Sequence, residues 1–301
     1  MAQPPEQAAG APPATPPAPL DGLVLVDKPA GISSHAVVAA VRRALGGKKA
    51  ERVGHAGTLD PFATGLMLVL VGRGTRTSQF AVGLDKRYET LAQLGALSTT
   101  GDPEGEITVT GRVPASPLHL PTGEITQRPP AYSAIKINGQ RAYKLARAGH
   151  DVEVPERTIT VYGFEELARE GDQVRLAVHC STGTYIRTLV ADLGDGYCLE
   201  LRRTAVGPWS IGDAAPLAEL TDRAAVAARL IPLERALPFL PSFVLPPDQA
   251  RAIHHGRRVP LADLPPELPR GAPVLVLDGD GAVAIAQADR ASLSAVVGFR
   301  A

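Results

Sequence analysis

The residues best suited to chemistry lie in a glycine-rich segment, Gly54–Gly65, which presents one carboxylate, Asp60, and one imidazole, His55. Glycines allow tight or left-handed backbone conformations and let a ligand approach closely. Pro61 fixes its own φ angle and restricts the backbone of Asp60 before it. A hydrophobic run, Leu66–Val71, follows at once. The pattern predicts a stiff turn, anchored by a buried strand or helix, in which Asp60 is a nucleophile, a general base or a helix cap.

Regular elements must position this turn, and the hydrophobic pattern predicts several on both sides of it. Gly22–Val26 is typical of a buried strand. Ser33 and Ser34 are good N-caps for a helix of apolar residues at helical spacing that ends at Gly46-Gly47. Arg87–Leu97 alternates as a strand does. Further strands are predicted at Thr158–Tyr162, Gln173–His179, Leu199–Val206, Val274–Leu277 and Val283–Ala288, and further helices at Thr184–Leu193, Ala224–Leu230 and Asp248–His254.

The order of these elements predicts the fold class and the domains. Helices are mixed with strands in hairpin-like succession, which favours an α+β fold with a largely antiparallel sheet. Residues 1–20 are rich in Pro, Ala and Gln and predict a disordered tail. A proline-rich linker near residue 240 separates a main domain, residues 21–238, from a smaller one, residues 239–301.

Composition limits the class of protein. The chain has 301 residues, of which 45% are hydrophobic, and this fits a globular protein. No apolar run is long enough to cross a bilayer, and the N-terminus lacks a secretory pattern, so a cytoplasmic protein without a membrane partner is expected. Cys180 and Cys198 cannot form a disulfide framework and are expected to be buried hydrophobes. No zinc spacing, phosphate loop or nucleophile elbow occurs.

Charge is balanced overall but clustered locally. The 31 basic and 31 acidic residues give a net charge of zero, which argues mildly against a nucleic-acid-binding protein. Each basic cluster fits a solvated face, but several of them flank the Asp60 segment and together favour a polyanionic substrate. The clusters are Arg42, Arg43, Lys48, Lys49 and Arg52; Lys136, Arg141, Lys144 and Arg147; Arg202 and Arg203; and Arg257 and Arg258.

Six segments, in order along Gly22–Gly207, together resemble the TruB family of tRNA pseudouridine synthases. They are Leu25–Gly31, Gly54–Gly65, Lys86–Tyr88, Pro130–Lys136, Cys180–Arg187 and Leu201–Arg203. Beyond them, Leu245–Ala250 with Gly256–Val259 resembles a small RNA-binding PUA-type domain. The resemblance implies a pseudouridine synthase fold with a mixed, largely antiparallel sheet, followed by a small, β-rich, PUA-like domain.

The implied activity is an isomerisation of the uridine at position 55, in the T loop of tRNA. Such enzymes break the C1′–N1 bond, turn the uracil and rejoin it through C5, without cofactor or metal. By motif, Asp60 is the nucleophile, Tyr88 packs against the base and assists removal of the C5 proton, and Arg187 pairs with Asp60 and keeps it ionised. The implied substrate contacts are His55, Tyr185, Leu201, Lys28 and Arg202.

The resemblance also implies the partners. We expect a monomer that binds the T arm of tRNA without a guide RNA and clamps it with an insertion at about residues 121–152. Two alternatives remain at this stage. One is a synthase of the same fold that a separate RNA guides to its uridine, and the other is a tRNA-binding or tRNA-folding protein without chemistry.

Overall fold

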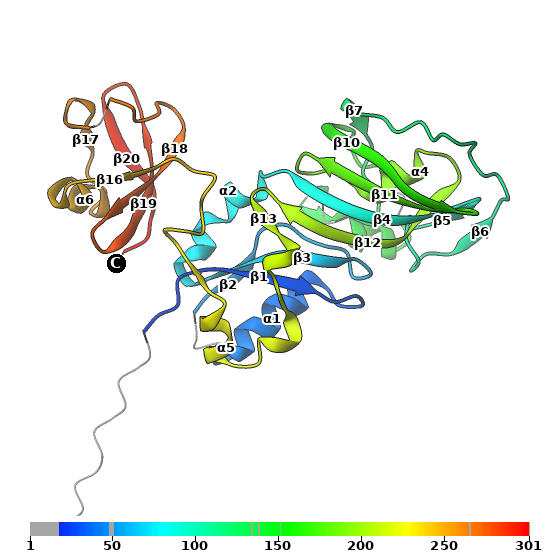
Figure 1. Ribbon diagram of the computed structural model, residues 1–301, viewed down its shortest axis with the longest axis horizontal. Coiled ribbons are helices and arrows are strands. Elements are labelled where there is room, and N and C mark those ends of the chain that lie inside the picture. Colours follow the sequence, from blue (N-terminus) through cyan, green and yellow to red (C-terminus); the bar gives the residue numbers. More distant parts are fainter. Residues whose placement is uncertain are drawn as a thin grey trace, which may run out of the picture.

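The computed structural model describes residues 18–47, 51–133, 135–137, 139–150, 152–264 and 266–300. Figure 1 shows a large twisted sheet with helices against it and, at the C-terminal end, a separate smaller sheet. Residues 1–17 of the predicted tail lie outside the described residues. The end of that tail is held in place, because the Leu20 N–H donates to Glu51 at 3.0 Å and Arg223 donates to the Ala18 carbonyl at 2.7 Å.

The large sheet has eleven strands within the described residues. Its order is β14-β1-β3-β12-β4-β11-β10-β7, while β15, β2 and β13 pair with β1, β3 and β12. Only β1–β14 and β3–β12 are parallel among these pairs, so the predicted mixed, largely antiparallel sheet is confirmed. The strands are β1 (Gly22–Lys28), β2 (Val53–His55), β3 (Thr64–Val71), β4 (Lys86–Leu94), β7 (Gly123–Gln127), β10 (Arg157–Glu170), β11 (Gln173–Cys180), β12 (Gly196–Val206), β13 (Trp209–Ser210), β14 (Ala215–Pro216) and β15 (Ile231–Pro232).

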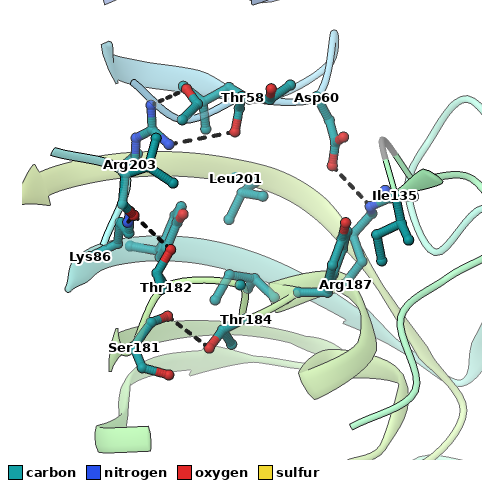
Figure 2. Close-up of a pocket in the computed structure, with 17 residues that line it drawn as sticks. Thr58, Asp60, Lys86, Ile135, Ser181, Thr182, Thr184, Arg187, Leu201 and Arg203 are labelled. Carbon is teal, nitrogen blue, oxygen red and sulfur yellow. Dashed lines mark hydrogen bonds and ion pairs between the residues drawn. The ribbon is translucent and has the colours of Figure 1, made fainter. Parts of the chain in front are cut away.

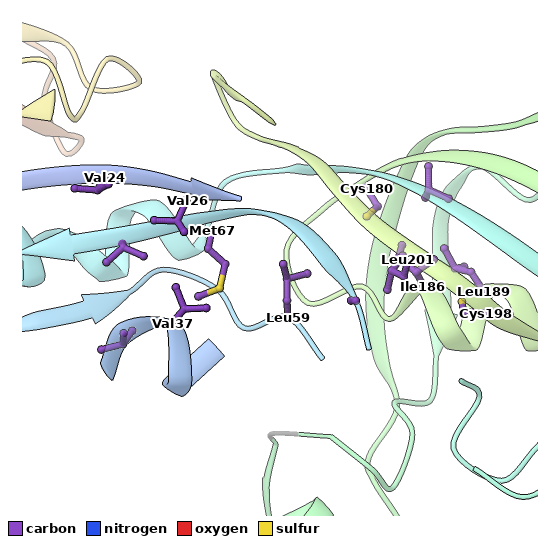
Figure 3. Close-up of a cluster of buried hydrophobic side chains, with 14 of the residues drawn as sticks. Val24, Val26, Val37, Leu59, Met67, Cys180, Ile186, Leu189, Cys198 and Leu201 are labelled. Atoms are coloured by element: carbon purple, nitrogen blue, oxygen red, sulfur yellow. The ribbon is translucent and has the colours of Figure 1, made fainter. Parts of the chain in front are cut away.

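The central strands β1 and β3 are buried on both faces, which explains their continuous apolar sequences. Val24 of β1 and Met67 of β3 pack with Val37 of helix α1 (Ser34–Ala44) in the main core (Figure 3). Their neighbours Leu23 and Leu66 point to the other face and join a second cluster. The predicted helix is confirmed, with Ser33 as its N-cap. Because side chains pack against both of its faces, β3 is a rigid anchor for the Asp60 segment that precedes it.

The remaining elements of the large unit surround the sheet. The strand predicted at Arg87–Leu97 is interrupted at Gly95, whose φ of +73° ends β4. The predicted insertion at residues 121–152 contributes β7 to the sheet edge and a small hairpin with a helix, and its role as an RNA clamp stays a prediction. These elements are β5 (Ala96–Ser98), β6 (Ile107–Val109), β8 (Lys136–Ile137), β9 (Gln140–Arg141), α2 (Ser78–Val82), α3 (Ala142–Arg147), α4 (Ile186–Ala191), α5 (Arg223–Ala228) and the 3₁₀ helices η2 (Gly72–Thr77), η3 (Ile211–Asp213) and η4 (Leu217–Glu219).

The C-terminal sheet has the order β16-β18-β19-β20-β17 and is covered by helix α6. The two strands predicted at Val274–Leu277 and Val283–Ala288 form a hairpin, in which Asp278 pairs with Gly281 where β18 turns into β19. The elements are β16 (Ser242–Val244), α6 (Pro247–His254), β17 (Val259–Pro260), η5 (Leu261–Asp263), β18 (Pro273–Asp278), β19 (Gly281–Ala288) and β20 (Ser292–Gly298).

The two sheets are joined by an apolar cluster and by hydrogen bonds. Leu233 and Leu237, which precede the predicted boundary, pack with Ile285 and Phe299 of the C-terminal unit. Arg76 of η2 donates to the Gly298 carbonyl at 2.6 Å. This contact ties the smaller unit to the larger one. Within the described residues, no helix is long and apolar enough to cross a membrane.

Candidate active site

The segment that carries Asp60 connects β2 to β3, and buried side chains hold its backbone. Ser34, which is 1% exposed, accepts the Leu59 N–H at 2.8 Å and donates to the Leu59 carbonyl at 2.9 Å. The ammonium of Lys28 donates to the carbonyls of Pro61 and Ala63 at 3.0 and 2.5 Å. The turn is therefore fixed around Asp60, as an active-site carboxylate requires.

Arg203 of β12 holds the other end of this turn. Its guanidinium donates to the carbonyls of Gly57 and Thr58, at 3.2 and 3.5 Å, and to that of Leu66 at 2.7 Å. The side chain is buried, with 1% of the residue exposed. Sequence reasoning weighed a solvated face against substrate binding for Arg202 and Arg203, and it missed this role of Arg203.

The carboxylate of Asp60 forms an ion pair with Arg187 at the start of α4 (Figure 2). The distance from Arg187 Nε to Asp60 Oδ2 is 3.0 Å, and Arg187 Nη1 lies 3.2 Å from Asp102 Oδ2. Arg187 also donates to the carbonyls of Thr100 and Tyr132, at 2.5 and 2.8 Å. The guanidinium is thus shared by two carboxylates, of which sequence reasoning predicted only Asp60.

Burial and charge act in opposite directions on Asp60. Burial raises the pKa of its carboxyl group, and Asp102 adds to this, whereas Arg187 and Lys28 lower it. Burial also lowers the pKa of Lys28 to about 8. The two cations therefore favour the ionised carboxylate that a nucleophile needs, against the effect of burial.

A cavity of about 320 Å³ lies beside the Asp60 carboxylate. Tyr88 from β4, Tyr185 before α4 and Leu201 from β12 line it, so the structure brings these predicted residues together around Asp60 and Arg187. Burial raises the pKa of both phenols, which keeps their hydroxyl groups protonated at neutral pH. The full lining is Gly57, Thr58, Leu59, Asp60, Val82, Lys86, Tyr88, Ile135, Ser181, Thr182, Gly183, Thr184, Tyr185, Ile186, Arg187, Leu201 and Arg203.

A second cavity, of about 750 Å³, shares Asp60 and Arg187 with the first. Asp102, Glu104 and His35 contribute to its lining. The ion pair of Asp60 and Arg187 therefore borders both hollows and is accessible from each.

Three predicted site residues do not line the first cavity. His55 lies outside it, with its ring centroid 5.7 Å from that of His35. Burial and the neighbours His35 and Arg203 lower the pKa of His55, so this imidazole is neutral at pH 7. Arg202 pairs with Asp27 at 2.7 Å, and its side chain is 42% exposed.

Lys28, predicted to bind substrate, is 0% exposed, and its ammonium is occupied by backbone carbonyls. In this position it supports the turn rather than reaching the cavity. Cys180 and Cys198 are buried free thiols, as expected. Within the described residues, no group of three or more His, Cys, Asp or Glu side chains is placed to hold a metal ion.

Comparisons with known proteins agree with this geometry. A sequence model described as TruB family pseudouridylate synthase, N-terminal domain, matches residues 42–186. The chain is 48% identical over 212 residues to tRNA pseudouridine synthase B of Pseudomonas fluorescens, and this alignment covers 67% of this chain and 68% of that protein. It is 40% identical over 279 residues to tRNA pseudouridine synthase B of Stutzerimonas stutzeri, covering 87% and 89%. A chain from the crystal structure of a Cbf5-Nop10-Gar1 complex superposes with a TM-score of 0.70 at 27% identity, covering 93% of this chain and 84% of that one.

Proposed function

Because the chain belongs to the TruB family of pseudouridylate synthases, we propose that it converts the T-loop uridine of tRNA to pseudouridine with Asp60 as the nucleophile. The observation that carries the proposal is the Asp60 carboxylate, 3.0 Å from a buried guanidinium and at the wall of a cavity lined by two tyrosines. The name shared by the relatives supports tRNA as the substrate.

The cavity receives the uracil base. A uridine must leave its stack before an enzyme can reach its glycosidic bond, and aromatic or apolar side chains then replace the neighbouring bases. Tyr88 and Leu201 supply such surfaces here, while Ser181 and Thr184 add hydroxyl groups for the polar edge of the base. Ordinary ligand cavities have a volume from about 300 Å³ upward, which suits a single base.

Asp60 acts at the glycosidic centre. Breaking the C1′–N1 bond develops positive charge at C1′, which an adjacent carboxylate stabilises or traps. Arg187 favours the ionised form of Asp60 against burial, which raises the pKa of that carboxyl. Asp102 keeps Arg187 in place from the other side.

The rest of the reaction needs no external reagent. The C1′–N1 bond breaks, the base turns within the cavity, and a C1′–C5 bond forms. The proton on C5 then leaves, and N1 gains a proton, so the product is an isomer of the substrate. We assign the C5 face of the base to Tyr88, a half-buried residue that lines this cavity.

We keep His55 and Arg202 as RNA contacts outside the cavity and reassign Lys28 to support of the turn. The partner in this proposal is the T arm of tRNA, bound by the protein alone without a guide RNA. Exposed Arg251 and Arg257 on the C-terminal unit supply positive charge for the phosphate backbone of the tRNA, in keeping with a PUA-like domain spanning residues 239–301.

Tritium release from a tRNA transcript carrying C5-labelled uridine tests the proposal. The purified protein alone is expected to release one tritium per tRNA, with the pseudouridine mapping to the T loop. Asp60→Asn is expected to abolish release while the tRNA still binds. Activity that requires an added guide RNA would favour the guided alternative, and binding without any release would favour a tRNA-folding protein.

A further inference from the structure

The buried guanidinium of Arg203 has an unusual set of partners. Its acceptors in the turn and in β3 are the carbonyls of Gly57, Thr58 and Leu66, none of which is a carboxylate. Burying a charged group is costly unless it is paired, and neutral carbonyls compensate the cost less than a carboxylate does. A residue kept only for stability would be replaced by an apolar one at little cost, so this arrangement points to a positional role.

The sheet fixes where this guanidinium can lie. Arg203 pairs with Gly65 of β3 in a parallel register and with Tyr88 of β4 in an antiparallel one. The strands approach so closely that a Cβ added at Gly65 would lie 2.3 Å from the Arg203 carbonyl oxygen. Gly65 also has a φ of +104°, which disfavours other residues. The backbone of Arg203 is therefore locked against the end of the turn, and its side chain extends beneath it.

Arg203 also reaches the second group that the proposed reaction uses. Arg203 and Tyr88 lie directly opposite each other in the antiparallel β12–β4 pair, so their side chains share one face of the sheet, and both line the base cavity. The guanidinium lowers the pKa of the Tyr88 phenol against the effect of burial. In Figure 2, Arg203 lies at the Thr58 end of the turn while Arg187 faces Asp60 at the other end. One side chain thus holds the nucleophile turn and lies beside the residue on the C5 side of the base.

We propose that Arg203 is a positioning residue for this isomerisation, which holds the Asp60 turn in fixed relation to Tyr88 across the base cavity. The inference rests on the proposed function and adds a residue to it. Since the guanidinium contacts the protein rather than bound RNA, its loss is expected to slow the chemical step and to leave tRNA affinity unchanged. A displacement of about 1 Å in an active site lowers a rate by about 10²-fold.

The test compares Arg203→Ala, Arg203→Lys and the wild type in single-turnover tritium release at saturating protein, with the tRNA dissociation constant measured separately. The matched control is Arg175→Ala, because Arg175 lies in the same sheet, is 43% exposed and only approaches Glu200 at 3.8 Å. For Arg203→Ala we expect a rate about 10²-fold lower with an unchanged dissociation constant. The control is expected to match the wild type in both.

Added guanidinium ion at millimolar concentration is expected to restore much of the rate of Arg203→Ala, because it fills the site that the side chain leaves, whereas urea is expected to have no such effect. Arg203→Lys keeps the charge but lacks the planar fork. We therefore expect a rate about 10-fold lower for Arg203→Lys, again with normal binding. This variant carries the test if Arg203→Ala does not fold.

Three results would overturn the inference. They are a wild-type rate in either folded variant, a loss of tRNA affinity equal to the loss of rate, and no response of Arg203→Ala to guanidinium ion. Failure of the proposed function itself has a different signature, because the wild type would then release no tritium.

Discussion

Arg187 is shared by two carboxylates that differ in exposure. This difference predicts that removing the Asp60 charge abolishes activity without loss of stability, whereas removing the Asp102 charge lowers stability and leaves part of the activity. The side chain of Asp60 is 33% exposed and that of Asp102 only 6%, while that of Arg187 is 4% exposed. Asp102 also accepts hydrogen bonds from the Thr100 hydroxyl at 2.5 Å and from the Glu104 N–H at 3.1 Å. We therefore expect Asp60 to serve the reaction and Asp102 to serve both the structure and the reaction.

For Asp60→Asn we expect no loss of stability at pH 7. The Asp60–Arg187 pair is only partly exposed, but Arg187 keeps Asp102 as a second partner, so this substitution leaves no buried guanidinium unpaired. Because the folded state raises the pKa of Asp60, the folded protein binds this proton more tightly than the unfolded chain does, and stability falls as pH rises from the ordinary pKa of 3.8 through the raised value. Above the raised pKa that cost is present, and the amide removes it. The free energy of unfolding is expected to equal that of the wild type or to exceed it by up to about 1 kcal/mol.

For Asp102→Asn we expect a marked decrease in the free energy of unfolding. Removing one partner of a buried ion pair costs about 3 kcal/mol or more. In a unit of this size that lowers the melting temperature by roughly 6–12 °C. Because Arg187 then loses one of its two anchors and Asp60 shifts with it, the single-turnover rate is expected to fall by about 10²-fold rather than to background.

The assay is urea unfolding at pH 7 beside tritium release for both variants and the wild type. Asp60→Asn should be the more stable of the two variants and inactive. Asp102→Asn should be less stable and partly active. Equal destabilisation by the two substitutions, or measurable turnover by Asp60→Asn, would refute this account of the shared guanidinium.

The remaining predictions concern the elements around the site. Arg223 lowers the pKa of Glu51 to about 2, so this pair contributes stability above the ordinary pKa of 4.5 that is lost as pH falls towards 2. Glu51→Gln is expected to lower the free energy of unfolding by roughly 1–3 kcal/mol at pH 7 in urea titrations, and a difference that persists undiminished at pH 2 would contradict this. Gly65→Ala, which places a Cβ against the Arg203 backbone at a φ of +104°, is expected to cost about 3 kcal/mol or more, whereas Gly279→Ala, with open space around it, should change the melting temperature little. A chain cut at residue 238 would expose Leu233 and Leu237, which pack on the C-terminal unit, so we expect a loss of roughly 3–6 kcal/mol and aggregation on heating, and light scattering equal to that of the full chain would argue against it.

Local patterns were sufficient for most elements and for the turn that presents Asp60. The caps and apolar spacing around Ser33 predicted α1, and the alternation of Arg87–Leu97 predicted β4, because these signals act between neighbours in the chain. The glycines and the proline around Asp60 predicted a stiff turn for the same reason. Asp60, Tyr88 and Arg187 were therefore found from the sequence and its resemblance to a family.

The partners of these residues depended on contacts distant in sequence. Asp102 had no local signal, because its role exists only where its hairpin meets α4. The family resemblance implied that Lys28 binds substrate, and only the packing of β1 beneath the turn places its ammonium among carbonyls.

Arg202 and Arg203 show most clearly what could not be predicted from the sequence. Adjacent residues of a strand point to opposite faces, but the sequence does not say which face is covered. By itself, it determined the strand, the basic pair and the turn at Asp60. The tertiary structure decided that Arg202 faces Asp27 at the surface while Arg203 is buried beneath that turn, because β12 lies between β3 and β4.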